Sequence, residues 1–364
     1  MSRISKLLAF LSRASITGLA LAFVIVYLWP KIMGEPETPP ENAQTVQAAP
    51  ASYADAVNRA APAVVSIYTR AFIAPSAENS AFLNQMRLRA ISSEGSGVIM
   101  REDGYILTNE HVIRGVSFMS IVLWDGRIVP ARVVGADPST DLAVLKVDLE
   151  GLPVATVKKD GAVSVGDVVL AIGNSLGLSH TVSLGIVSAT GRNDLRSLLY
   201  QDFIQTDAAI NSGNSGGALV DTTGALVGIN TRYVDGTKGA QNIGFAIPIT
   251  LAHDVMDQII DYGTVRRGWM GADYSDLAPR IQPDGTAVHV GIGVREVQRG
   301  GPAWNAGIRP GDLILTLDGE PVSDASRFRL AISQRVPGSK VELEVQRGNE
   351  PFQTYATLIQ QPPL

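Results

Sequence analysis

Short β-like runs, each broken by glycine or aspartate, constrain the fold of this chain more than any other feature. They follow one another from about residue 53 to residue 249 and are rich in Val, Ile and Thr. The runs read "GSGVIM", "GYILTNEHVI", "SIVLWDG", "IVPARVVGAD", "LAVLKVD", "DVVLAIG", "HTVSLGIVSATG", "ALVGINTRY" and "GFAIPI". This spacing, with 36 glycines available for turns, is typical of a closed barrel or a sandwich. We therefore expect a mainly β protein.

A helix predicted just after these runs marks a domain boundary. The stretch "TLAHDVMDQIIDYG" places Leu251, Val255, Ile259 and Ile260 on one helical face and ends at Gly263. The β-rich domain should therefore span residues 53–263. Residues 264–364 carry the apolar runs "GIGVREV", "DLILTLDG" and "KVELEVQ" and a helical "SDASRFRLAISQ", enough for one small α+β domain.

The N-terminus predicts a membrane anchor. Three basic residues, Arg3, Lys6 and Arg13, precede an almost uncharged run from Ala14 to Trp29, so residues 1–30 read as a cytoplasmic stub and a transmembrane helix. Residues 31–52 are rich in proline and polar side chains and should form a flexible linker. No small-residue cleavage pattern follows closely, which favours an uncleaved anchor; a cleaved signal peptide is the alternative. Either alternative places most of the chain outside the cytoplasm.

Composition excludes several classes of function. With 30 Lys and Arg against 35 Asp and Glu, the net charge of -5 predicts no general nucleic-acid surface. The absence of cysteine excludes disulfides and thiol catalysis, and four histidines without metal-ligand spacing predict no metal site. We expect no cofactor.

Three residues predict a serine protease. Ser215 lies in the glycine-rich stretch "INSGNSGGAL", His111 follows a strand-like run, and Asp141 precedes the next apolar run. A serine hydroxyl becomes a nucleophile only when a base takes its proton and a third group orients that base. Each residue alone would be an ordinary turn or partly buried residue, but together they occur in the chymotrypsin-like order His, Asp, Ser.

The glycines around the serine predict an oxyanion hole at Gly213, Asn214 and Ser215. The amides of Gly213 and Ser215 are the expected donors, because a chain without bulky Cβ atoms can turn tightly enough to aim them at one oxygen.

The first substrate pocket is expected to be apolar and of modest size, suited to a small aliphatic residue. Its predicted lining is Ile210, Ile229 and Asn230.

The motifs together resemble the HtrA/Deg family of bacterial envelope serine proteases from about residue 53 onward. The resemblance rests on "GYILTNEHVI", "DLAVLKV", "AIGN", "VSLGIVSATGR", "IQTDAAINSGNSGGALV", "VGIN" and "IGFAIP". It implies two perpendicular chymotrypsin-type β-barrels followed by a PDZ domain, with His111 as general base, Asp141 as its orienting acid and Ser215 as nucleophile.

The C-terminal region is similar to a PDZ domain. Residues Trp269, Met270 and Gly271 match the loop with which such domains bind a peptide's terminal carboxylate, and "NAGIRPGDLI" follows at the expected distance. Ala272 stands where a larger aliphatic residue is usual, which predicts a roomier pocket for the peptide's last side chain.

Within the family the chain is most similar to the DegS (AlgW) branch. That resemblance implies a homotrimer in the bacterial inner membrane with its catalytic and PDZ domains in the periplasm. The C-termini of misfolded outer-membrane proteins would bind the PDZ domain and permit cleavage of a membrane-spanning anti-sigma factor. Arg192 matches a loop arginine of the switch between inactive and active states. Ser175 and Leu176 depart from the family's usual proline and aromatic residue.

Two other functions stay open at this point. A peptide-binding sensor or chaperone with a vestigial triad is one, although all three triad residues are intact. A soluble quality-control protease that degrades unfolded periplasmic proteins broadly is the other.

Overall fold

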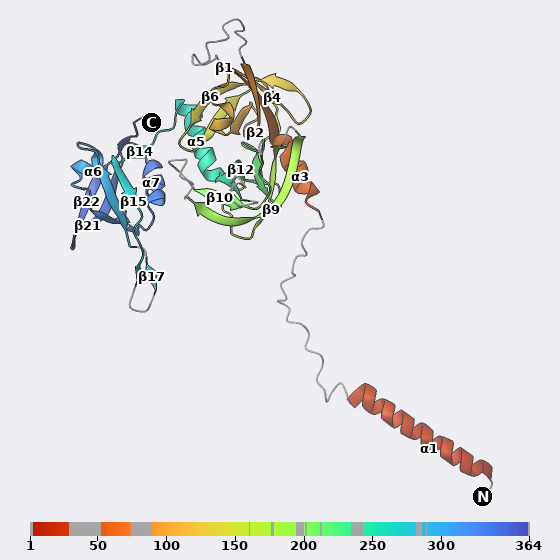
Figure 1. Ribbon diagram of the computed structural model, residues 1–364. Coiled ribbons are helices and arrows are strands. Elements are labelled where there is room, and N and C mark those ends of the chain that lie inside the picture. Colours follow the sequence, from red (N-terminus) through yellow and green to blue (C-terminus); the bar gives the residue numbers. More distant parts are fainter. Residues whose placement is uncertain are drawn as a thin grey trace, which may run out of the picture. The chain divides into compact units, whose positions relative to one another are not determined.

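The chain divides into two compact units, Met1–Ser52 and Tyr53–Leu364 (Figure 1). The computed structural model describes residues 3–28, 52–73, 89–159, 161–175, 178–193, 200, 202–211, 213–233, 243–281, 286–288 and 290–362. Apart from Ser52, the predicted linker 31–52 lies outside the described residues, and so does Leu176.

The first unit contains one continuous helical segment. Helix α1 (Arg3–Phe23) continues into the π-helical turn η1 (Val24–Leu28). Neither this segment nor any other helix in the described part of the chain has the length and apolar character that a membrane crossing requires. The anchor stays a prediction.

The second unit begins with a short helix, α3 (Ala54–Ala60), and a 3₁₀ turn, η2 (Ala61–Ala63), and continues into a seven-stranded antiparallel sheet. The strand order is β5-β4-β1-β2-β3-β7-β6. Its strands are β1 (Val64–Ile73), β2 (Arg89–Ile99), β3 (Tyr105–Thr108), β4 (Phe118–Val122), β5 (Ile128–Pro130), β6 (Arg132–Asp137) and β7 (Leu142–Lys146), with helix α4 (Glu110–Ile113) after β3.

The next strands close into a barrel in the order β10-β13-β12-β11-β8-β9. They are β8 (Val168–Ser175), β9 (Leu178–Arg192), β10 (Phe203–Thr206), β11 (Ala218–Asp221), β12 (Leu226–Tyr233) and β13 (Gly244–Pro248). The mainly β prediction is confirmed. The family resemblance implies two β-barrels. Strands β8 to β13 form a closed barrel, whereas strands β1 to β7 form a seven-stranded sheet.

Helix α5 (Ile249–Tyr262) covers the junction between these strands and ends where the sequence predicts. Gly263 adopts a left-handed conformation (φ 73°), and its amide donates to the Ile259 carbonyl oxygen, which terminates the helix. Val255 and Ile259 are buried in the largest apolar core, whereas Leu251 and Ile260 are partly buried against it. The predicted apolar face is therefore the packing face.

The C-terminal region has its own apolar core and a sheet of order β15-β18-β19-β21-β22, with β20 paired to β19. Two small two-stranded sheets, β14-β23 and β16-β17, accompany it. The elements are β14 (Gly268–Trp269), β15 (Ala272–Ser275), β16 (Arg280–Ile281), β17 (Ala287–Val288), β18 (Ile292–Val297), α6 (Pro302–Asn305), β19 (Leu313–Leu317), β20 (Glu320–Pro321), α7 (Ala325–Ser333), β21 (Lys340–Arg347), β22 (Glu350–Thr357) and β23 (Ile359–Gln360).

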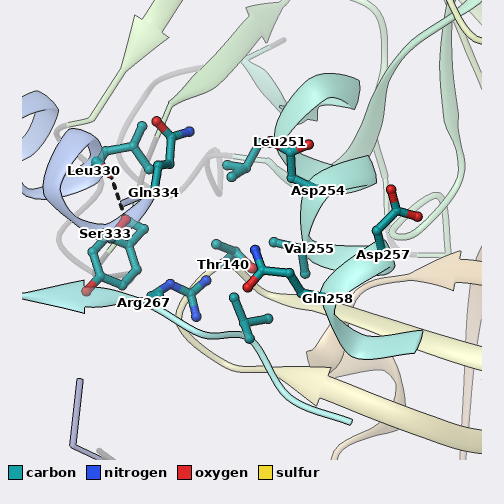
Figure 2. A pocket seen from close by; sticks show the side chains of 12 residues that line it. Thr140, Leu251, Asp254, Val255, Asp257, Gln258, Arg267, Leu330, Ser333 and Gln334 are labelled. Carbon is teal, nitrogen blue, oxygen red and sulfur yellow. Dashed lines mark hydrogen bonds between the residues drawn. The ribbon is translucent and has the colours of Figure 1, made fainter. Parts of the chain in front are cut away.

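A buried ion pair ties the start of the C-terminal region to the β-rich region. Arg267 donates to both carboxylate oxygens of Asp137, through Nη1 at 2.9 Å and through Nη2, and both side chains are less than a tenth exposed. The guanidinium also lies 4.8 Å from the ring centroid of Tyr200, whose hydroxyl donates to Gln361 at 2.7 Å. Arg267 and Tyr200 line a cavity of about 250 Å³ that α5 and α7 also border; Figure 2 shows its lining side chains.

Breaking this pair on one side should destabilise the protein strongly. We expect Arg267→Met to lower the free energy of unfolding by about 3–5 kcal/mol, because Asp137 would remain buried without its cation. The measurement is urea-induced unfolding of the full chain.

The exposed pair between Arg335 and Asp318, 2.7 Å apart, provides the matched control. Arg335→Met should cost no more than about 1 kcal/mol, as exposed pairs do. The double variant Arg267→Met/Asp137→Leu should recover only part of the loss, because leucine removes the buried charge but also the acceptor of the Ser139 amide and the Thr140 hydroxyl. Equal costs for the two single arginine variants would contradict the prediction.

Candidate active site

His111 is positioned by the turn that follows β3. It lies in α4, whose preceding residue Asn109 is fully buried and donates through its side-chain amide to the Asp141 carbonyl oxygen at 2.9 Å. The neighbouring Glu110 amide donates to the same oxygen at 3.1 Å. These two bonds join the histidine's turn to the residue that precedes β7, so the strand pairing of β3 with β7 brings the two predicted site residues together.

Asp141 holds the histidine ring by its carboxylate. The Nδ1 atom of His111 lies 2.8 Å from Oδ2 and 3.0 Å from Oδ1, and the His111 amide donates to Oδ1 at 3.0 Å. Asp141 has a positive φ of 61°, an unusual conformation for a residue with a Cβ. Because Nδ1 faces the carboxylate, Nε2 is the ring nitrogen left to act as a base.

The surroundings of Asp141 favour its ionised form. Burial by itself would raise the pKa of Asp141, but the hydrogen bond and charge of His111, the Thr231 hydroxyl and the His111 amide outweigh burial and lower that pKa below its usual value. Since the folded-state pKa lies below the unfolded one, the carboxylate stabilises the fold above the ordinary aspartate pKa of about 3.9. That contribution is lost as the pH falls through the lowered pKa.

Ser215 lies in a turn that is pressed against two strands. A Cβ atom on Gly216, which has φ 82°, would lie 2.1 Å from the Ser96 carbonyl oxygen, and one on Gly217 would lie 2.3 Å from the Ile172 carbonyl oxygen. The Ser96 amide donates to the Ser215 carbonyl oxygen at 2.8 Å. The two glycines are therefore required by close backbone approach, which fixes the serine at the edge of both sheets.

The Ser215 hydroxyl is bonded to Thr231. Its Oγ donates to the Thr231 carbonyl oxygen at 2.8 Å, and no hydrogen bond joins it to His111 in the described part of the chain. The Thr231 hydroxyl in turn donates to Asp141 Oδ2 at 2.8 Å. Thr231 thus contacts both the acid and the serine, and the Ser215 hydroxyl must give up its bond to the Thr231 carbonyl oxygen before it can donate to His111.

Asn214, between the two expected oxyanion donors, uses its own amide within the turn. That amide donates to the Asn211 carbonyl oxygen at 3.0 Å, while the Gly213 carbonyl oxygen accepts from Ser96 Oγ at 2.7 Å. Gly213 has φ 96°, a conformation that favours glycine. The oxyanion role of Gly213 and Ser215 stays a prediction.

The three predicted pocket residues are all buried. Ile210 is 4% exposed, and Ile229 and Asn230 are 0% exposed. Ile229 packs in the largest core cluster, and Asn230 donates to the Ala218 carbonyl oxygen at 2.9 Å. All three side chains lie in the protein interior, and their role as the lining of the first substrate pocket stays a prediction.

The remaining predicted residues lie on other elements than Ser215. Arg192, at the end of β9, donates through Nε to Gln205 Oε1 at 2.9 Å. Trp269 ends β14, and Met270 and Gly271 form the turn between β14 and β15, where Gly271 has φ 71° and Met270 is buried in the C-terminal core.

Sequence reasoning missed Thr231 and Asn109. Thr231 lies within the predicted β-like run "ALVGINTRY", and Asn109 lies two residues before His111 in "TNEHVI". Neither residue type at these positions by itself indicates a contact with Asp141.

Thr231→Val should lower kcat/KM by roughly 10- to 100-fold, because a hydrogen bond to a charged group contributes about 1.5–3 kcal/mol. Valine keeps the shape of threonine but removes the donor to Asp141, which should also raise the pKa of that carboxyl toward its usual value. Hydrolysis of a chromogenic peptide measures the effect. Thr231→Ser, which retains the hydroxyl, is the control, and equal losses in both variants would exclude a role for the donor.

Comparisons with known proteins agree with this architecture. The trypsin-like peptidase domain family matches residues 95–229, and the PDZ domain family matches residues 268–358. Serine endoprotease DegS of Escherichia coli is 41% identical over 358 residues, 97% of this chain and 98% of the relative. The solved structure of the HtrA-type protease AlgW with decapeptide is 45% identical and covers 86% of this chain and 100% of its own, with a TM-score of 0.72. Likeness of this extent shows that the chain belongs to the HtrA family of trypsin-like serine endoproteases, which carry a PDZ domain.

Proposed function

We propose that this protein is a regulated envelope endoprotease whose peptide hydrolysis is gated by its PDZ domain. C-terminal segments of misfolded outer-membrane proteins would be the activating ligands, and a membrane-spanning anti-sigma factor would be the substrate. The chain would act as a homotrimer in the periplasm, anchored in the inner membrane by residues 1–30.

The chemistry assigns one role to each triad residue. Ser215 Oγ leaves the Thr231 carbonyl, turns to His111 Nε2 and attacks the scissile carbonyl carbon as His111 takes its proton. Asp141 stays ionised and stabilises the imidazolium. The amides of Gly213 and Ser215 hold the oxyanion, and His111 then protonates the leaving amine, which releases the first product.

One observation supports gating more than any other: the predicted peptide-binding loop and Tyr200 border the same cavity. This cavity of about 120 Å³ is bordered by Trp269 and Met270 and also by Tyr200. The Tyr200 amide donates to the Ser139 carbonyl oxygen at 3.3 Å, two residues before Asp141. A peptide that fills this cavity would therefore contact a residue bonded to the segment that carries the catalytic acid.

The anchor and the signalling role draw support from the sequence and its relatives. The basic residues before the apolar run are typical of a cytoplasmic flank. The DegS relatives match this chain along nearly its whole length.

A broad quality-control protease is the second candidate. A relative from Chlamydia trachomatis, named "Probable periplasmic serine endoprotease DegP-like", favours this candidate. It is 42% identical over 269 residues, which cover 74% of this chain and 54% of the relative.

Activation by peptides distinguishes the two functions. A regulatory protease should cleave a peptide substrate slowly alone and much faster with an activating C-terminal peptide, and should stay in the membrane fraction. A broad protease should degrade unfolded casein without activator. If the wild type cleaves no peptide even with activating peptides present, the regulatory proposal fails.

The binding site and the catalytic site should be separable by mutation. Gly271→Val introduces a β-branched residue at φ 71°, and its Cβ would contact the Trp269 ring at 3.3 Å. This variant should lose peptide affinity while a fluorophosphonate still labels Ser215. Loss of both properties together would contradict separate sites.

A further inference from the structure

Ser96 lies against the turn that carries Ser215 and is bonded to that turn twice. Its backbone amide donates to the Ser215 carbonyl oxygen at 2.8 Å, and its side-chain Oγ donates to the Gly213 carbonyl oxygen at 2.7 Å. Ser96 belongs to β2 and is 0% exposed. One buried residue therefore holds the carbonyl groups of both residues whose amides are expected to bind the oxyanion.

The direction of the Ser96 hydroxyl is set by a further hydrogen bond. The Asn174 amide donates to Ser96 Oγ at 2.8 Å, so this bond occupies a lone pair of the oxygen while the hydroxyl hydrogen is given to the Gly213 carbonyl oxygen. The oxygen is also tightly packed, since a Cβ atom on Gly173 would lie 2.9 Å from it. Removal of this one oxygen would leave less space than a water molecule needs, so both of its partners would stay buried without a bond.

The bond from Ser96 Oγ fixes a peptide plane beside the first expected oxyanion donor. This plane joins Gly213 to Asn214. Its carbonyl oxygen accepts from Ser96 Oγ, and its amide donates to the Asn211 carbonyl oxygen at 3.0 Å. Because the plane is held at both ends, only the φ and ψ of Gly213 set the position and direction of the Gly213 amide. Without Ser96 Oγ the plane would be held at one end, and the Gly213 amide would be free to move with it.

Of the two expected donors, Gly213 depends more on this support. Its φ of 96° lies in a region that glycine adopts about as readily as negative φ, so its own backbone preference does not hold one direction. The Ser215 amide belongs to a different peptide, whose carbonyl oxygen, that of Asn214, accepts from the Gly217 amide at 2.9 Å. That bond does not involve Ser96. Loss of the Ser96 hydroxyl should therefore loosen one donor and leave the other in place.

We propose that Ser96 is a positioning residue of the protease, whose hydroxyl holds Gly213 so that the Gly213 amide is aimed at the oxyanion. This inference rests on the proposed oxyanion role of Gly213 and Ser215. Ser96 contacts no substrate and takes no part in proton transfer. It acts where negative charge develops, so it stabilises the transition state more than the bound substrate.

Kinetics of Ser96→Ala in the full-length protein give the first test. Because one donor is loosened and not removed, kcat for a chromogenic peptide should fall roughly 10- to 100-fold, less than the cost of about 100- to 1,000-fold for a lost oxyanion donor. KM should stay within about 2-fold, since the bound substrate carries no oxyanion. Ser96→Cys fills the same site with a weaker donor and should change kcat in the same direction.

A transition-state analogue measures the oxyanion itself. A peptidyl trifluoromethyl ketone is attacked by Ser215 Oγ at its carbonyl carbon, the serine proton passes to His111, and the carbonyl oxygen becomes the oxygen of a hemiketal. Amide donors stabilise the ionised form of this oxygen, so wild type should hold the hemiketal pKa below the pKa of the ketone hydrate in water. Ser96→Ala should raise the hemiketal pKa by about 1 to 2, the equivalent of the loss in kcat. Carbon NMR of a ketone isotopically labelled at the reacting carbon measures this pKa.

Ser333→Ala is the matched control. Ser333 is also buried, at 4% exposed, and its hydroxyl donates to the Leu330 carbonyl oxygen at 2.7 Å, the bond that Figure 2 shows as a dashed line. The substitution removes the same kind of bond but on α7, where Ser333 has no bond to the Ser215 turn. Both alanine variants should lose some stability against urea. Only Ser96→Ala should raise the hemiketal pKa, and Ser333→Ala should keep kcat within about 2-fold of wild type.

Two results would overturn the Ser96 inference and leave the oxyanion role intact: a lowered hemiketal pKa that Ser96→Ala does not raise, or an equal rise in Ser333→Ala. A wild-type hemiketal pKa no lower than the pKa of the ketone hydrate in water would instead refute the oxyanion role of Gly213 and Ser215, and the Ser96 inference with it. Failure of the proposed function is thereby distinguished from failure of the Ser96 inference.

Discussion

Ser215→Ala is expected to reduce kcat by about five to six orders of magnitude, as loss of a nucleophilic serine does in serine proteases. The reason is chemical: alanine has no oxygen to form the acyl-enzyme, and water must attack instead. Purified variant and wild type are compared with a peptide substrate and saturating activator peptide. Activator affinity should stay within about 2-fold, because the predicted peptide-binding loop contains no part of the triad.

Ser183 provides a matched control for this substitution. Its hydroxyl donates to the Ala209 carbonyl oxygen at 2.8 Å, the same kind of bond and length as that between Ser215 and Thr231. If Ser215 served only the structure of its turn, Ser183→Ala and Ser215→Ala should have similar effects. Residual activity above about 1% in Ser215→Ala would mean that another residue is the nucleophile.

Asp141→Asn should lower kcat by about 10⁴-fold with little change in the fold, as the equivalent change does in serine proteases of the same triad type. The carboxylate accepts from His111 Nδ1, the His111 amide and the Thr231 hydroxyl. An asparagine amide turns one of these acceptors into a donor, so the ring would be held with its proton on the wrong nitrogen.

The exposed pair between His253 and Asp257 on α5 provides the control for Asp141→Asn. Their Nδ1 and Oδ2 atoms lie 3.2 Å apart, and both side chains are about half exposed. Asp257→Asn should leave kcat within about 2-fold of wild type, since an exposed pair contributes little. Similar losses in both variants would show that the effect of Asp141→Asn is not specific to the triad.

The same carboxylate predicts an acid-dependent loss of stability. Because the pKa of Asp141 is lowered in the folded state, wild type should lose stability relative to Asp141→Asn as the pH falls from about 5 through the lowered pKa. Urea unfolding at several pH values measures this difference, and a constant difference across the range would contradict the assignment.

Much of the fold could be predicted because its signals are local. The β-like runs reappear as strands β2 to β9, β12 and β13, and the helix over residues 249–262 ends at Gly263 because glycine adopts a positive φ at little cost. The run "SDASRFRLAISQ" contains α7, whose first turn is capped by the Asp324 carboxylate. Strands β1, β10, β11, β15 and β22 were not among the predicted runs, because each is short or interrupted by charged or polar residues.

The sequence by itself determined which residues could perform the chemistry. His111, Asp141 and Ser215 were identified by residue type, order and flanking glycines, and the close approach of backbone at Gly216 and Gly217 explains why those glycines are there. These properties depend on what each residue is and on its immediate neighbours.

Only the tertiary structure decided how those residues are arranged. Thr231 and Asp141 are 90 residues apart in sequence, yet their side chains are hydrogen-bonded. The bond forms because the fold brings β12 beside the turn that precedes β7. The bond between the Ser215 hydroxyl and the Thr231 carbonyl oxygen, the burial of Ile229 and the placement of Arg329 beside Asp273 likewise follow from strand register and helix packing. The physical reason is that a side chain's direction depends on backbone segments distant in sequence, so the same residues could point toward or away from one another in another packing.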